Sequence, residues 1–266
     1  IMIFTQLNRI LRLCRPRIKS PVLDEATLKV REQEAYGKYS WDFNSAVKNL
    51  NTIRRSFELE EYRNDQDLPR EQILFSAISN HHQVNRILEI GTATGRSTFM
   101  LSQLFPDSKI LTIDLPETDS VFLDYAGMKG NTQKLAEFNQ TQVRNIREKN
   151  IEFVRCNSFL LPAITDETFD LIWVDGGHFF PEVSWDICNA FHYCNIGGHI
   201  IIDDVSEPRE GKISDKVSSD PRKMLEYLKC RLGIDVDFFL KRTDRRSLSD
   251  PAKLKYLGVI RKREFI

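Results

Sequence analysis

The stretch that decides the fold is Ile87-Leu-Glu-Ile-Gly-Thr-Ala-Thr-Gly-Arg-Ser-Thr98. The apolar residues within Asn85–Ile90 predict a buried strand, because they form a short β-prone run. Gly91 and Gly95 follow, and glycine allows both a sharp turn and a close approach of the backbone to a ligand. From Ser97 onward, apolar residues recur at helical spacing, so a helix should begin there with unpaired N–H groups in its first turn. The stretch therefore predicts a strand, a ligand-binding turn and a helix, and an ordinary structural turn is the alternative.

Strands and helices alternate along the rest of the chain, which predicts a parallel sheet with helices on both faces. The expected fold is α/β: a doubly wound, mostly parallel seven-stranded sheet. The other predicted strands are 109–114, 151–156, 169–174, 199–202, 236–240 and 256–261, and the predicted helices are 68–84, 140–149, 181–195 and 221–232. Residues 117–142 are expected to form a mobile insertion that shapes the pocket. Gly197-Gly198 is expected to end the predicted helix 181–195.

The first quarter of the chain predicts a helical appendage over residues 1–66, a possible lid, followed by the main domain over 67–266. Residues 1–21 carry five basic and no acidic residues, with apolar positions at helical spacing. A packing or oligomer helix is the favoured interpretation, and a peripheral membrane anchor or a targeting peptide are the alternatives. An aromatic cluster at 36–43 either seats the appendage on the core or forms a lid over a substrate.

Composition argues against several classes of function. Lys plus Arg is 38 and Asp plus Glu is 38, so no net positive charge attracts nucleic acid. No apolar run is long enough to span a bilayer. The five cysteines lack paired metal-type spacing, which favours a reducing, cytoplasmic compartment. The expected partner is a small molecule.

Polar residues follow several predicted strands, and ligands in parallel sheets bind outside the carboxyl ends of the strands. Asp114 ends the second strand, where a carboxylate can accept hydrogen bonds from the hydroxyls of a ribose. Asn157, with Ser158 after it, ends the third strand, where an amide can bond an adenine edge. The alternatives are a solvated acid for Asp114 and an Asx turn for Asn157.

A second set of polar residues ends the fourth and fifth strands: Asp175 with His178, and Asp203 with Asp204. Three carboxylates in one place repel one another unless they are protonated or neutralised. A hard divalent cation would neutralise them, and oxygen ligands favour Mg²⁺ over Zn²⁺. His178 is close enough to act as a base. The alternative is a solvent-facing acid pair beside an ordinary loop histidine.

Two motifs carry a resemblance to known families. The Glu-x-Gly-x-x-x-Gly pattern of Glu89–Gly95 resembles the first motif of class I S-adenosylmethionine (SAM) methyltransferases, whereas a dinucleotide site would need glycine at Ala93. Val174–His178, Gly197-Gly198 and Ile202–Asp204 together resemble metal-dependent small-molecule O-methyltransferases. The nearer relatives are sugar O-methyltransferases of the macrocin type, because the catechol family has Asp-Asn at the acid pair and lysine in place of the histidine.

This resemblance covers about residues 70–262 and implies the cofactors, the site and the activity. SAM would be bound by Glu89, Gly91, Thr92, Gly95, Ser97, Asp114, Asn157, Ser158 and Asp175. Mg²⁺ would be bound by Asp175, Asp203 and Asp204, and His178 would be the catalytic base. The implied activity is methylation of a small-molecule hydroxyl, first of a sugar or glycosylated natural product and second of a phenol or catechol. A metal-independent methyltransferase and a SAM-binding protein without catalysis are the alternatives.

Overall fold

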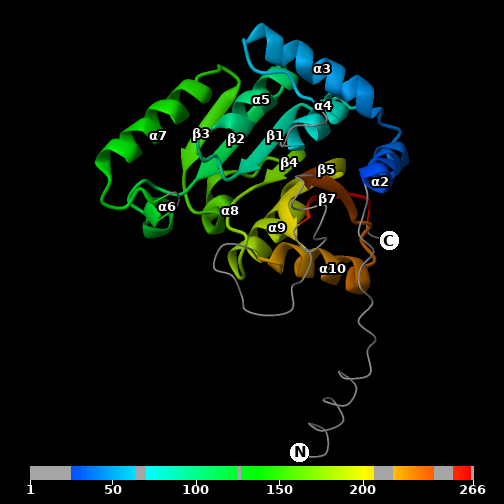
Figure 1. The fold of residues 1–266 in the computed structure, drawn as a ribbon. Coiled ribbons are helices and arrows are strands. Elements are labelled where there is room, and N and C mark those ends of the chain that lie inside the picture. Colours follow the sequence, from blue (N-terminus) through cyan, green and yellow to red (C-terminus); the bar gives the residue numbers. More distant parts are fainter. Residues whose placement is uncertain (1–24, 64–69, 125–126, 207–217, 243–253, 265–266) are drawn as a thin grey trace, which may run out of the picture.

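The computed structural model describes residues 25–63, 70–124, 127–206, 218–242 and 254–264. Its centre is one seven-stranded sheet with the order β3-β2-β1-β4-β5-β7-β6 (Figure 1). The strands are β1 Arg86–Ile90, β2 Lys109–Asp114, β3 Ile151–Arg155, β4 Phe169–Val174, β5 Cys194–Ser206, β6 Asp237–Arg242 and β7 Lys255–Arg261. Strands β1 to β5 run parallel, and β7 pairs antiparallel with both β5 and β6. The predicted fold class is confirmed.

Helices cover both faces of the sheet because successive strand residues point to opposite sides. Ile87 of β1 packs into a hydrophobic cluster with side chains of α4 (Glu71–His81) and α5 (Arg96–Leu104). Leu88 packs into a cluster with side chains of α9 (Glu182–Tyr193) and α10 (Asp220–Leu232). Figure 1 shows these two helix layers above and below the sheet. The helices are α2 Glu25–Lys38, α3 Phe43–Ser56, α4 Glu71–His81, α5 Arg96–Leu104, α6 Ser120–Asp124, α7 Thr132–Asn145, the 3-10 helix η2 Ser158–Leu160, α8 Leu161–Ile164, α9 Glu182–Tyr193 and α10 Asp220–Leu232.

The prediction of a mobile insertion at 117–142 is wrong. The described part of this segment contains α6 and most of α7, which begins eight residues before the predicted helix. Asn131 caps α7 by accepting a hydrogen bond from Lys134 N at 3.0 Å. The early turns of α7 are largely polar, so they lack the apolar period that reveals a helix, although their residue types favour helix formation.

The predicted end of the fifth strand is also wrong. Gly197 and Gly198 lie inside β5 instead of ending α9, and β5 continues through Asp203 and Asp204 to Ser206. Its register against β7 shifts between Ile202 and Val205, and Asp204 has a φ of 51°. The acid pair therefore lies in a β-bulge. Pairing with β7 extends the strand, and local sequence carries no sign of that partner.

The aromatic side chains of the N-terminal segment pack against the body of the domain. Tyr36 and Trp41 are buried, and their rings lie 5.1 Å from Phe239 and 5.5 Å from His199 by centroid. His199 lies four residues before Asp203 on β5, towards the opposite end of the sheet. These contacts match the seating interpretation of the aromatic cluster. The lid stays a prediction, and the predicted helix at 1–21 lies outside the described residues.

No helix in the described ranges is both long and apolar enough to cross a membrane.

Candidate active site

The glycine turn brings the ends of β1 and β4 into direct contact. Gly91 N donates to Ile113 O at 2.9 Å, and Asp175 N donates to Ile90 O at 2.8 Å. A Cβ on Gly91 would collide with the Asp175 carbonyl group, and the φ of Gly91 is +99°. Only glycine fits this position without strain. The predicted turn is present, and backbone packing against Asp175 fixes it. Its binding of a ligand stays a prediction.

Glu89 lies beneath the turn, with no exposed surface. Its Oε2 accepts hydrogen bonds from the hydroxyls of Thr98 and Thr112, the latter at 2.6 Å, and Thr112 also bonds Thr92 at 2.6 Å. Burial raises the Glu89 pKa to about 7 despite these bonds. The side chain joins β1 to β2 and α5. Cofactor contacts by Glu89 and Thr92 stay predictions.

Asp114 connects the end of β2 to the same turn. Its Oδ2 accepts from Ala93 N at 2.7 Å and its Oδ1 from Leu115 N at 2.8 Å. Burial raises its pKa, while these backbone bonds act in the opposite direction. Each carboxylate oxygen can accept a second bond, so the geometry still suits ribose hydroxyls. The side chain is partly exposed, as a ligand contact requires.

Helix α7 supplies two contacts that the sequence did not reveal. Gln142 Nε2 donates to Ala93 O at 2.5 Å, and Asn145 Nδ2 donates to Thr94 O at 2.8 Å. Arg155 donates to Gln142 Oε1 at 2.7 Å and so holds the amide in place. These bonds fix a turn whose Ala93 has the rare φ of 45°. Gln142 and Asn145 are three residues apart, so in a helix they lie on the same face. This spacing could have indicated a shared contact if the helix had been predicted.

The predicted adenine-binding residues follow β3. Asn157 Oδ1 accepts from Phe159 N at 2.9 Å, as expected for the Asx-turn alternative. Its oxygen therefore caps η2 and can still accept one more hydrogen bond, and its NH₂ group is also available to an adenine edge. The carbonyl of Ser158 accepts from Asn189 at 3.0 Å. Ser97 is half-buried in the first turn of α5. Cofactor contacts by all three stay predictions.

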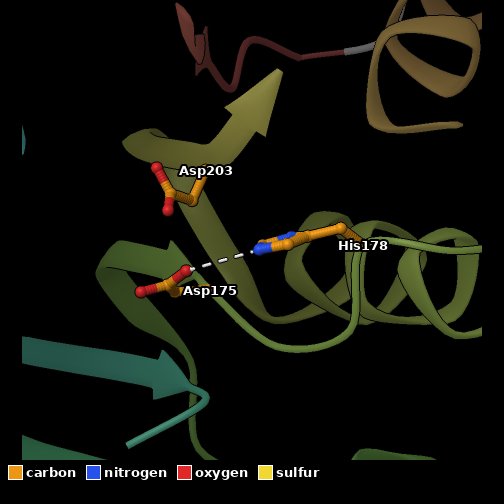
Figure 2. Close-up of side chains that lie close together, drawn as sticks. All are labelled: Asp175, His178 and Asp203. Carbon is orange, nitrogen blue, oxygen red and sulfur yellow. Dashed lines mark ion pairs between the residues drawn. The ribbon is translucent and has the colours of Figure 1, made fainter. Parts of the chain in front are cut away.

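A group of side chains that could bind a metal ion lies beside the turn. Asp175, His178 and Asp203 each offer one ligand atom, and these atoms all lie within 4.8 Å of one another (Figure 2). His178 Nε2 is 3.8 Å from Asp175 Oδ1. Asp203 is only 4% exposed, and its Oδ1 has no hydrogen-bond partner among the described residues. A buried carboxylate oxygen without a partner is costly, so this group is suited to hold a cation.

Electrostatics differ among the members of the group. Burial and the nearby Asp203 raise the pKa of Asp175 well above its ordinary value. Burial lowers the pKa of His178, although Asp204 and Asp203 act in the opposite direction. His178 is therefore neutral at neutral pH, which is the form that can accept a proton or bind a metal.

Asp204 has a different environment from the other predicted metal ligands. Its Oδ1 accepts from Lys241 Nζ at 2.6 Å, and its Oδ2 accepts from Lys255 Nζ. Burial would raise the Asp204 pKa, but the two lysines lower it below the ordinary value. Lys241 also contacts Asp203 Oδ2 at 2.5 Å. Sequence reasoning missed both lysines, because lysine is common and these lie 37 and 51 residues after Asp204.

Comparison with known proteins supports the fold and the domain. Residues 88–205 match the family model described as a methyltransferase domain. Cofactor-bound Rv0187 from MTB is 19% identical, with a TM-score of 0.55 over 82% of this chain and 90% of that one. An O-methyltransferase from Bacillus cereus in complex with SAH is 17% identical, with a TM-score of 0.50 over 89% and 99%. No curated protein sequence matches the chain. The sheet order and the similar solved structures together show a Rossmann-like fold, and within it residues 88–205 are similar to a methyltransferase domain.

Proposed function

We propose that the protein is a SAM-dependent O-methyltransferase that acts on a hydroxyl group of a small molecule. The first choice of acceptor is a sugar or a glycosylated natural product, and the second is a phenol or catechol. One observation carries the proposal: the group of Asp175, His178 and Asp203 lies directly against the glycine turn, where Gly91 contacts the Asp175 backbone. A methyl donor on the turn would therefore face an acceptor held at the acidic group.

The cofactor side of the proposal rests on the turn and on Asp114. Parallel sheets of this kind bind ligands outside the carboxyl ends of their strands, which is where both lie. The SAH complex of the similar O-methyltransferase from Bacillus cereus supports SAM as the donor. Gly91 and Gly95 would let the backbone approach the cofactor, and Asp114 would accept its ribose hydroxyls.

The acceptor side passes a chemical test for a divalent cation. Asp175 and Asp203 supply carboxylate oxygens, and one buried oxygen of Asp203 has no partner in the described part of the chain. These two residues would hold Mg²⁺, which when bound would make an acceptor hydroxyl more acidic. His178 has the position and the neutral charge to take the proton of that hydroxyl. Positioning of donor and acceptor would supply much of the rate.

A metal-independent methyltransferase is the second candidate, and one observation favours it. Lys241 and Lys255 already neutralise part of the negative charge of the Asp203–Asp204 pair. In that case the carboxylates would position the acceptor without a metal, and His178 would still be the base.

Calorimetry with SAM, with and without Mg²⁺ and an acceptor, tests the proposal. We expect SAM binding in all samples, and turnover with a hydroxyl acceptor that rises with Mg²⁺. Full turnover in excess chelator would select the metal-independent candidate. Binding without turnover on every sugar and phenol would favour a SAM-binding protein without catalysis, and no SAM binding would contradict the proposal as a whole.

A further inference from the structure

Two β-bulges lie on either side of β7, close to the acidic group. The register of β5 shifts between Ile202 and Val205, and the register of β6 shifts between Leu240 and Arg242. The residues at the shifts are the acid pair on β5 and Lys241 on β6. Bulges redirect side chains, whereas in a regular strand neighbouring side chains point to opposite faces. The bulge on β5 thus lets Asp203 and Asp204 reach the same ammonium group.

Lys241 is held in an unusual position for a lysine. Its side chain is 8% exposed, and its Nζ lies 2.5 Å from Asp203 Oδ2 and 2.6 Å from Asp204 Oδ1. Lysine is almost never fully buried unless it is paired with an opposite charge. Lys255 is more exposed, and among these acids it contacts Oδ2 of Asp204, which also lies 3.8 Å from His178 Nε2. Two ammonium groups therefore face the carboxylates of Asp175, Asp203 and Asp204. The buried carboxylate of Glu71 also acts electrostatically on Lys241 and Asp175.

The two lysines give Asp203 and Asp204 different hydrogen bonding. Both oxygens of Asp204 accept hydrogen bonds from lysine, so Asp204 holds the ammonium groups of Lys241 and Lys255 in place. Asp203 uses one oxygen for Lys241 and keeps the other, Oδ1, without a partner among the described residues. Asp203 belongs to the group formed with Asp175 and His178, in which it offers one carboxylate oxygen.

We propose that Lys241 is a resident cation of the acidic group, which competes with a divalent cation and restricts it to Asp175 and the free oxygen of Asp203. This inference rests on the proposed function in one respect, which is that the group of Asp175, His178 and Asp203 is the acceptor site. The contacts of Lys241 with Asp203 and Asp204 are present in the folded chain whatever the protein's activity is. Lys241 is thus a positioning residue that sets how tightly the site binds a metal.

Direct binding of Mn²⁺, followed by electron paramagnetic resonance, tests the inference without an activity assay. In Lys241→Met the positive charge next to Asp203 is lost, so Mn²⁺ should bind at least about tenfold tighter than in the wild type. Lys255→Met is the matched control. It removes the same charge from a more exposed position that does not touch Asp203, so its effect should be clearly smaller.

A charge-balanced variant keeps the test valid if Lys241→Met fails to fold. Lys241→Met combined with Asp204→Asn removes one charge of each sign and leaves the proposed ligands intact. Its Mn²⁺ affinity should stay within about threefold of the wild type, whereas Asp203→Asn should lose about tenfold or more. An equal loss in the double variant would make Asp204 a ligand and overturn the inference.

The wild-type arm separates this inference from the proposed function. If Mn²⁺ binds to Lys241→Met but not to the wild type, the proposed dependence on Mg²⁺ is wrong. The inference that Lys241 competes with a divalent cation is then supported. Mn²⁺ affinity that is unchanged or weaker in Lys241→Met overturns the inference, and so does an absence of binding in both proteins.

Discussion

The α-carbon of Gly91 lies against the carbonyl oxygen of Asp175, so no side chain fits between the ends of β1 and β4. The glycine turn and the acidic group therefore form one structural unit. A change at either residue alters both the proposed cofactor side and the proposed acceptor side.

Gly91→Ala should destabilise the fold as well as weaken SAH binding. A Cβ would collide with the Asp175 backbone, and the φ of +99° is unfavourable for any side chain. Gly130→Ala is the matched control, because Gly130 also has a positive φ, of +72°, but nothing lies near its added Cβ. Thermal unfolding should show a loss of about 1 kcal/mol for the control and clearly more for Gly91→Ala. Equal losses would mean that the contact with Asp175 is unimportant.

Glu89 should make the protein more stable at acidic than at neutral pH. Burial raises its pKa from 4.5 to about 7, so the folded state binds a proton that the unfolded state has released. This contribution is fully present below about pH 4.5 and is lost as the pH rises through about 7, with a maximum of about 3 kcal/mol. Denaturant unfolding of wild type and Glu89→Gln between pH 5 and pH 8 measures it. The wild type should lose stability relative to the variant as the pH rises, and a constant difference would contradict this.

The amide of Gln142 should support cofactor binding from outside the pocket. Gln142→Leu removes the hydrogen bond to Ala93 O, so the strained turn should lose its fixed geometry and SAH affinity should fall by about tenfold. Gln140→Leu makes the same change at an exposed position of the same helix and should leave affinity unchanged. Isothermal titration with SAH compares the two. Equal affinities would show that α7 does not hold the turn.

His178→Ala should reduce turnover by roughly 10²–10⁴-fold, which is the usual contribution of a general base. A sugar hydroxyl is a weak acid, so its proton must leave as the methyl group arrives. SAH affinity should barely change, because His178 lies among the acids and not at Asp114. Loss of SAH binding in this variant would place the histidine on the cofactor side, and near-normal turnover would exclude it as the base.

Much of the fold was predictable because its signals are local. The strands from Ile87, Lys109 and Phe169 are continuous apolar runs, and Gly91, Asp114 and Asp175 follow directly at their ends. The predicted bounds of the fifth strand were wrong because they depend on a partner that lies far away in the sequence. β7 extends β5 past Asp203, which turns a predicted strand end into a bulge.

The candidate site was only partly predictable for the same reason. Asp175, His178 and Asp203 come together as their places at strand ends suggested. Lys241 lies on another strand and becomes important only through the bulge that redirects it, and Gln142 acts through a helix whose first turns are mostly polar. Lys241 carries no sign of its role in its own neighbourhood, and the spacing of Gln142 and Asn145 becomes informative only after α7 is recognised as a helix.

The formation of SAH from SAM over a panel of sugars and phenols, with Mg²⁺ or with chelator, tests the central claim most directly. The wild type should produce SAH only when a hydroxyl acceptor is present. Asp114→Ala should need at least about tenfold more SAM, because it loses the proposed ribose acceptor. A wild-type protein that neither binds SAM nor forms SAH with any acceptor would contradict the account.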